Sequence, residues 1–132
     1  MTPRGFISIA ALYGGLAVAF GAFGAHALKD RLAAPALAAY ETAVRYQFYH
    51  ALALLFVGLW MLQPQAPSLR AVAFCFVVGT LLFSGSIYLL SLRTLLPFGE
   101  LRFLGPVTPL GGLLFLVGWG LLAAAAWRGA RP

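Results

Sequence analysis

Hydrophobic residues fall into four long runs without a charged side chain, separated by short polar segments. The runs cover residues 5–28, 46–69, 71–92 and 103–127. A transmembrane helix needs about 20 predominantly apolar residues, and every run is long enough. The pattern therefore predicts an all-α integral membrane protein, a four-helix transmembrane bundle with short loops, in one domain covering residues 1–132.

Prolines set the limits of the second span. Two prolines interrupt the segment 63–68, and proline lacks the backbone N–H that a helix interior needs, so the span should end near Leu62. The uncharged residues that remain are too few to cross a bilayer. We therefore expect this helix to begin earlier, near Ala36, with Pro35 at its first position.

Thr108 and Pro109 are typical of a helix start, with threonine as the N-cap and proline at the first helical position. The long apolar run at the N-terminus is interpreted as an uncleaved first helix. Together these boundaries predict spans at about residues 5–28, 40–62, 71–92 and 109–127.

Composition supports this placement in the bilayer. Hydrophobic residues make up 62% of the chain and charged residues only 9%, whereas a soluble domain has roughly 25% charged residues. The net charge of +6 comes from Lys and Arg placed singly between apolar runs, which favours interfacial anchoring over nucleic-acid binding. Cys75 is the only cysteine, so we expect neither a disulfide nor a metal site, and no resident cofactor.

With four spans, all three acidic residues and both histidines lie toward one membrane face. Lys and Arg are divided almost equally between the two faces, so the positive-inside rule gives no orientation. We expect any functional site to open toward the acidic, histidine-containing face. Its polar residues are His26, Lys29, Asp30, Glu41, Arg45, His50, Arg93, Glu100, Arg102 and Thr108.

The first span carries a helix-packing seam of small residues. Ala10, Gly14, Ala17, Gly21 and Gly24 recur at spacings of 4, 3, 4 and 3. Small residues let a neighbouring backbone approach closely in a membrane. The seam serves either its own bundle or a homodimer, and we favour the bundle.

The third span carries a polar stripe of Thr80, Ser84, Tyr88 and Ser91. The favoured interpretation is that Ser and Thr hydrogen-bond to the carbonyl four residues earlier in their own helix. The alternative is a hydrophilic lining at the bundle centre. In either case the tyrosine hydroxyl needs a partner, which places this face inward.

The second helix contributes two further polar groups. Glu41 and Arg45 are four residues apart, in the order that favours a helical ion pair. His50 and Gln47 lie on the opposite side of that helix, and His26 and His50 could meet near facing helix ends. The candidate polar cluster is therefore His26, Glu41, Arg45, His50, Ser84, Tyr88 and Thr108.

Four ordered motifs carry a family resemblance that covers essentially the whole chain. They are Gly21–His26, Tyr49–Leu52, Leu82–Leu90 and Thr108–Gly112, the last followed by Phe115 and Gly118–Trp119. With them the chain resembles domain-of-unknown-function family 423, small membrane proteins that include bacterial inner-membrane proteins and relatives of the eukaryotic transmembrane protein 256. The resemblance implies an integral membrane protein with several spans and implies no activity.

The leading functional hypothesis is a non-enzymatic inner-membrane bundle that acts as a subunit, stabiliser or assembly partner, within a homo-oligomer or a larger membrane complex. Two alternatives stay open. One is a conduit for a small solute, an ion or protons, which would use Thr80, Ser84 and Tyr88 of the polar stripe and a mouth formed by His26 and His50. The other is an intramembrane enzyme or a haem- or metal-binding membrane protein that would use His26 and His50.

Overall fold

The computed structural model describes residues 1–96 and 101–129, with Arg102 and Gly129 described by their backbone alone. Its helices are α1 (Pro3–Phe23), α2 (Ala34–Trp60), α3 (Arg70–Leu92) and α4 (Val107–Gly129). A π-helical turn at Gly24–Leu28 extends α1, and a 3₁₀ turn at Arg102–Leu104 precedes α4. No strand occurs in these residues, so the predicted all-α class is confirmed; Glu100 of the predicted polar face lies outside them.

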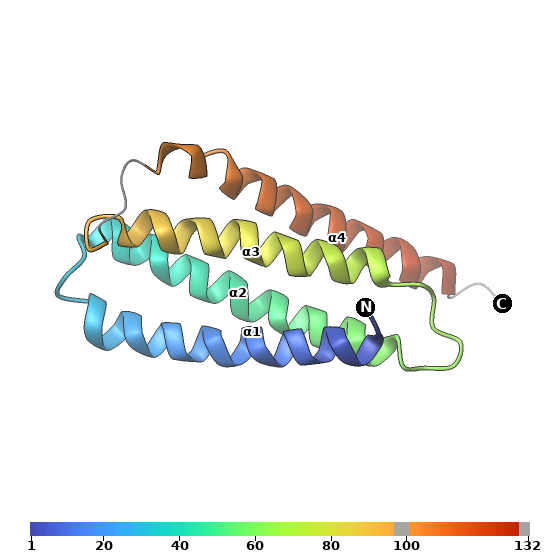
Figure 1. The fold of residues 1–132 in the computed structure, drawn as a ribbon. Helices are drawn as coiled ribbons and strands as arrows, with labels where there is room; N and C mark the ends of the chain where they lie inside the picture. The colour runs from blue at the N-terminus through green and yellow to red at the C-terminus, as the bar shows by residue number, and fades with distance from the viewer. Residues whose placement is uncertain (97–100, 130–132) are drawn as a thin grey trace.

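The extensive helix contacts are those between chain neighbours, α1 with α2, α2 with α3 and α3 with α4. Figure 1 shows consecutive helices running in opposite directions, with α1 and α4 at opposite edges of the bundle. The end where α1 stops, α2 starts, α3 stops and α4 starts is called the polar end below. The described charged residues that the sequence assigns to one membrane face lie toward this end, namely Lys29, Asp30, Glu41, Arg45 and Arg93.

Three segments are long and apolar enough to cross a membrane: Pro3–Leu28, Arg70–Leu92 and Val107–Arg128. α2 is not in this group, although four spans were predicted. The reason is local composition, because its first half carries Glu41, Arg45, Gln47 and His50 among the apolar residues. Composition and length therefore support three crossings, and the position of α2 must be argued from its surroundings.

The main apolar core lies away from the polar end. It joins the first half of α1 to the second half of α2 and the first half of α3, and Phe6, Leu54, Val57 and Phe76 are fully buried within it. A smaller cluster of Leu28, Leu32 and Tyr40 packs at the polar end. The bundle is thus tightly filled at one end and mixed in polarity at the other.

The predicted limits of α2 agree with the structure, whereas the start of α4 does not. α2 begins at Ala34 with Pro35 in its first turn and ends at Trp60, close to the expected Leu62. α4 begins at Val107, so Thr108 already lies inside the helix and the predicted N-cap is wrong. Its hydroxyl instead lies 2.6 Å from Ser86 Oγ on α3, a tertiary contact that sequence spacing does not reveal.

Glycines bring α3 and α4 into backbone contact. A Cβ on Gly111 would lie 2.8 Å from the Phe83 Cα and would overlap the Phe83 backbone nitrogen. A Cβ on Gly118 would lie 2.7 Å from the Phe76 ring, and one on Gly79 would lie 2.8 Å from the Phe115 ring. A side chain at Gly111 would collide with backbone atoms of Phe83, so only glycine fits at this point of the interface.

The small-residue seam of α1 faces α2 within the same chain. A Cβ on Gly21 would lie 3.4 Å from Val44, and one on Gly24 would lie 2.8 Å from the Tyr40 ring. Ala10 and Ala17 are buried, and Gly14 faces Ala51 of α2. The geometry therefore uses the seam to pack the bundle itself.

Candidate functional site

Gln47 links three helices through one buried amide. Its Nε2 donates to the backbone carbonyl of Tyr13 on α1 at 2.8 Å, and its Oε1 accepts from the Tyr88 hydroxyl of α3 at 2.9 Å. The side chain is 4% exposed. Burying an amide is costly unless it is hydrogen-bonded, and here the oxygen and the nitrogen each have a partner. This network holds α1, α2 and α3 together.

Tyrosines extend the network in both directions along α1. The Tyr13 hydroxyl donates to the carbonyl of Val77 on α3 at 3.2 Å. The Tyr40 hydroxyl donates to the carbonyl of Phe20 at 3.0 Å, and the Tyr40 and Tyr88 rings lie 5.0 Å apart. Each hydroxyl therefore reaches another helix, as expected for a phenol in an apolar interior.

The polar stripe of α3 divides into paired and unpaired hydroxyls. Ser84 Oγ donates at 2.9 Å to the carbonyl of Ala43 on α2, so back-bonding within α3 is the wrong interpretation for this residue. The prediction that Tyr88 needs an inward partner is confirmed by its bond to Gln47. Thr80 Oγ1 and Ser91 Oγ are buried with no hydrogen-bond partner in the described part of the chain.

His50 lies in the middle of α2, about 24 Å along the axis from the first residue of that helix at 1.5 Å per residue, and not at the start of a span. Its ring is 5% exposed and stacks on Phe115 of α4 with centroids 3.4 Å apart and planes 9° apart. Nδ1 lies 2.8 Å from the Tyr46 carbonyl, and Nε2 lies 3.2 Å from Trp119 Nε1.

These two contacts define the protonation state of the imidazole. An indole nitrogen only donates, so Nε2 of His50 accepts the bond from Trp119. A carbonyl only accepts, so the ring proton of His50 lies on Nδ1 and bonds to Tyr46. The histidine is therefore neutral, and both nitrogens are already engaged within the protein.

The remaining predicted site residues lie at the polar end and do not meet His50. His26 is exposed on the π-helical turn after α1. Glu41 and Arg45 are exposed on α2 and form no ion pair, and Arg45 donates instead to Thr42 Oγ1 at 3.3 Å. The predicted juxtaposition of the two histidines and the predicted Glu41–Arg45 pair are therefore both absent from the structure.

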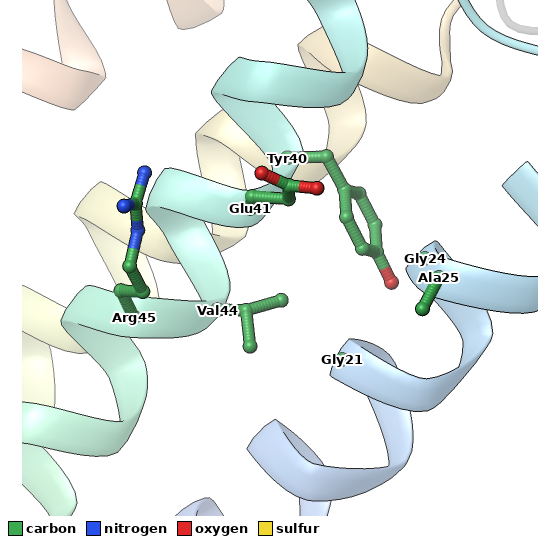
Figure 2. Close-up of a pocket in the computed structure, with 7 residues that line it drawn as sticks. All are labelled: Gly21, Gly24, Ala25, Tyr40, Glu41, Val44 and Arg45. Carbon is green, nitrogen blue, oxygen red and sulfur yellow. The ribbon is translucent and has the colours of Figure 1, made fainter. Parts of the chain in front are cut away.

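A small pocket of about 240 Å³ lies between α1 and α2 near the polar end. Figure 2 shows the Tyr40 ring directed from α2 toward Gly24 and Ala25 of the π-helical turn that follows α1, with Glu41 and Arg45 on the same helix as Tyr40. In the described residues no group of three or more His, Cys, Asp or Glu side chains could hold a metal ion. The site is thus mainly a set of interhelical hydrogen bonds.

Sequence reasoning missed the most connected residues of this site. Gln47 was assigned to a face of α2 but not to a network, and Tyr13 and Trp119 were not proposed as hydrogen-bonding groups. One signal was available for Gln47, because an amide within an uncharged run in a membrane must find a partner. The backbone carbonyls of Tyr13 and Ala43 could not be identified as acceptors from the sequence, because every residue has a backbone carbonyl.

Three membrane-length apolar helices and a buried interhelical polar network define an all-helical integral membrane protein. Residues 20–112 match the family described as "Protein of unknown function (DUF423)", and the chain belongs to this family. It is 38% identical to a UPF0382 membrane protein of Staphylococcus saprophyticus, over 93% of this chain and 97% of the relative.

It is also 38% identical to the UPF0382 inner membrane protein YgdD of Escherichia coli K12, over 97% of this chain and 93% of the relative. No solved structure matches the chain. The predicted family and the predicted membrane location are confirmed by these relatives, whose names describe membrane proteins and state no activity.

Proposed function

We propose that this protein is a non-enzymatic membrane bundle that serves as a subunit, stabiliser or assembly partner for other membrane components. The observation that carries the proposal is the direction of its buried polar groups. Gln47, Ser84 and His50 direct their hydrogen bonds to other groups of the same chain. A catalytic or conducting site needs such groups to face a substrate or water, whereas a packing element needs them satisfied internally.

A groove between α1 and α2 offers a surface for a partner helix. It has a volume of about 380 Å³ and combines a floor of small residues with aromatic walls. Close packing against small residues is how helices associate when lipid is as apolar as the side chains. The residues that line this groove are Ala17, Val18, Gly21, Ala22, Val44, Arg45, Phe48 and Tyr49.

We also propose that α2 is a fourth membrane crossing. The helix has 27 residues, or about 40 Å at 1.5 Å per residue, which exceeds the roughly 30 Å hydrocarbon core. It lies alongside α1 and α3, which are both apolar enough to cross (Figure 1). Its polar Gln47 and His50 are bonded inside the bundle, and its charged Glu41 and Arg45 lie toward the polar end.

The topology is tested with single cysteines at the two ends of α2. In a Cys75→Ser background, Arg31→Cys and Gln65→Cys are each labelled in intact cells or sealed vesicles with a thiol reagent that does not cross membranes. Four crossings predict that only one of the two sites is labelled before the membrane is permeabilised. Labelling of both sites from the same side would exclude α2 as a crossing.

The assembly role is tested by affinity capture from native membranes with a bulky residue in the groove. Ala22→Leu fills the groove, and Ala123→Leu is the matched control because Ala123 is also an exposed helical alanine. We expect mass spectrometry to recover a membrane partner with the wild-type protein and the control but not with Ala22→Leu. Absence of a partner with the wild-type protein, or equal recovery with both variants, would contradict the proposal.

The alternative conduit has one supporting observation, the unpaired buried hydroxyl of Thr80 in the stripe of α3. Flux across proteoliposomes that Thr80→Val and Ser84→Ala abolish would favour it over the assembly role. For the haem or metal alternative, a ligand at His50 Nε2 would first have to displace Trp119. Visible absorbance of the purified protein that His50→Ala removes would support that alternative.

A further inference from the structure

A cavity of about 610 Å³ opens at the polar end between α2 and α3, beside the start of α4. Its volume lies within the roughly 300–1,000 Å³ range of small-molecule sites. One wall is apolar and consists of Ala36 and Ala39 of α2 with Ile87 and Leu90 of α3. The other part is polar, so the cavity has two chemically different halves.

The polar half contains one buried hydroxyl without a partner in the described part of the chain. Ser91 lines the cavity and is 5% exposed, and its Oγ has no hydrogen-bond partner among the described residues. Leaving a buried hydroxyl unpaired costs on the order of a hydrogen bond, so a ligand that supplied an acceptor would be favoured here. Arg93 and Thr94 add an exposed guanidinium and a second hydroxyl at the rim.

The electrostatics of the cavity favour an anion. Among the residues that the structure describes, Arg93 is the one charged side chain that lines it. The first turns of α2 and α4 also reach it, through Pro35 and Thr108, and helix N-termini carry partial positive charge. The Thr108 hydroxyl is already bonded to Ser86, which leaves Ser91, Thr94 and Arg93 as the side-chain donors.

We propose that this cavity binds an anionic phospholipid, with the phosphate against Arg93, Thr94 and Ser91 and an acyl chain along Ala36, Ala39, Ile87 and Leu90. The position fits this ligand, because α3 ends and α4 begins at the membrane interface where headgroups lie. Basic pockets between transmembrane helices are suited to anionic headgroups. Free phosphate has the same polar chemistry but makes no use of the apolar wall.

The test uses the delipidated full-length protein in a neutral detergent, with lipid binding measured by native mass spectrometry. The probes are phosphatidylglycerol, phosphatidylcholine with the same acyl chains, and inorganic phosphate. Both lipids carry the phosphate, but the choline cation of phosphatidylcholine is repelled by Arg93. We therefore expect phosphatidylglycerol to bind about tenfold more tightly. Arg93→Gln should remove this preference, while Arg70→Gln, at the opposite end of α3, should retain it.

Ser91→Ala supplies a second, independent readout. Because the lipid-free protein leaves this hydroxyl unpaired, the alanine variant should keep or raise the lipid-free Tm while it weakens phosphatidylglycerol binding several-fold. Equal affinity for the two lipids, or unchanged binding in both Arg93→Gln and Ser91→Ala, would overturn the proposal. Inorganic phosphate that bound as tightly as phosphatidylglycerol would overturn the assignment to a lipid.

Discussion

The contact between α3 and α4 and the contact of α2 with α1 and α3 are built from different chemistry. α3 and α4 approach through glycines, and a Cβ on Gly111 would overlap the backbone of Phe83. α2 also packs on α1 through small residues and on both neighbours through the apolar core. Its contact with α1 and α3 contains in addition a set of buried side-chain hydrogen bonds centred on Gln47. The contact at Gly111 depends on the absence of a Cβ, whereas the Gln47 network depends on particular polar atoms being present.

The difference teaches how helices associate when the surrounding solvent is as apolar as their side chains. In lipid, association depends on close packing and on interhelical hydrogen bonds. A glycine contact uses many weak dispersion interactions that any added carbon would prevent. A hydrogen bond tolerates a larger separation between helix axes, which leaves room for the tyrosine rings between α1, α2 and α3.

The largest effect is expected from Gly111→Ala at the glycine interface. The new Cβ would meet Phe83 backbone atoms that cannot rotate away, so unfolding in detergent should become easier by about 1–3 kcal/mol or more. Gly120→Ala in the same helix is the control, because nothing lies within 4 Å of its Cβ position. Gly120→Ala should be neutral or stabilising, because alanine stabilises the interior of a helix relative to glycine. Equal Tm values for the two variants would show that α3 and α4 are not in backbone contact.

An intermediate effect is expected at the polar interface, where a double-mutant cycle measures the Gln47–Tyr88 bond. Gln47→Leu, Tyr88→Phe and the double variant are compared by reversible unfolding in mixed micelles. The coupling free energy should be about 0.6 kcal/mol and at most about 1.7 kcal/mol, the range for hydrogen bonds between membrane helices. Tyr49→Phe, at an exposed tyrosine, should show no change, and zero coupling would mean that the bond adds nothing to this interface.

The smallest effect is expected from Trp119→Phe. This variant tests how much a single hydrogen bond from α4 to α2 contributes to the free energy of unfolding. The substitution keeps an aromatic ring near Phe76 but removes the donor to His50 Nε2. Destabilisation should be about 1 kcal/mol or less, with Trp127→Phe, at an exposed tryptophan, as the control. NMR of the His50 ring should show the proton on Nδ1, and a proton on Nε2 would contradict the assigned bond to Trp119.

Much of the fold was predictable because bilayer-length apolar runs and prolines are local signals. The runs located all four helices, and Pro35 marked the first turn of α2. The start of α4 was misplaced by its local signal, because Thr108 bonds to Ser86 across the bundle and does not cap its own helix. A cap and a tertiary contact use the same hydroxyl, and sequence spacing cannot separate them.

The sequence predicted which polar residues belong to the candidate site better than it predicted their hydrogen-bond partners. The polar stripe of α3 was predictable from residue spacing. The inward direction of Tyr88 was predictable because a buried tyrosine hydroxyl needs a hydrogen-bond partner. The pairing of Ser84 with the Ala43 carbonyl did not follow, because the acceptor belongs to the backbone. Glu41 and Arg45 satisfied the helical spacing rule and still formed no ion pair, since both are exposed and such pairs gain little there.

The sequence by itself determined that the chain lies in a lipid bilayer, that it is helical, which family it belongs to and that α1 carries a seam of small residues. These properties depend on composition and on short-range patterns in the sequence. Only the tertiary structure decided which polar atoms meet. It placed His50 against Trp119 and Phe115, away from His26, and gave Ser91, beside a cavity, no hydrogen-bond partner among the described residues. The physical reason is that a hydrogen bond needs two atoms within about 3 Å, and the relative rotation and depth of neighbouring helices set that distance.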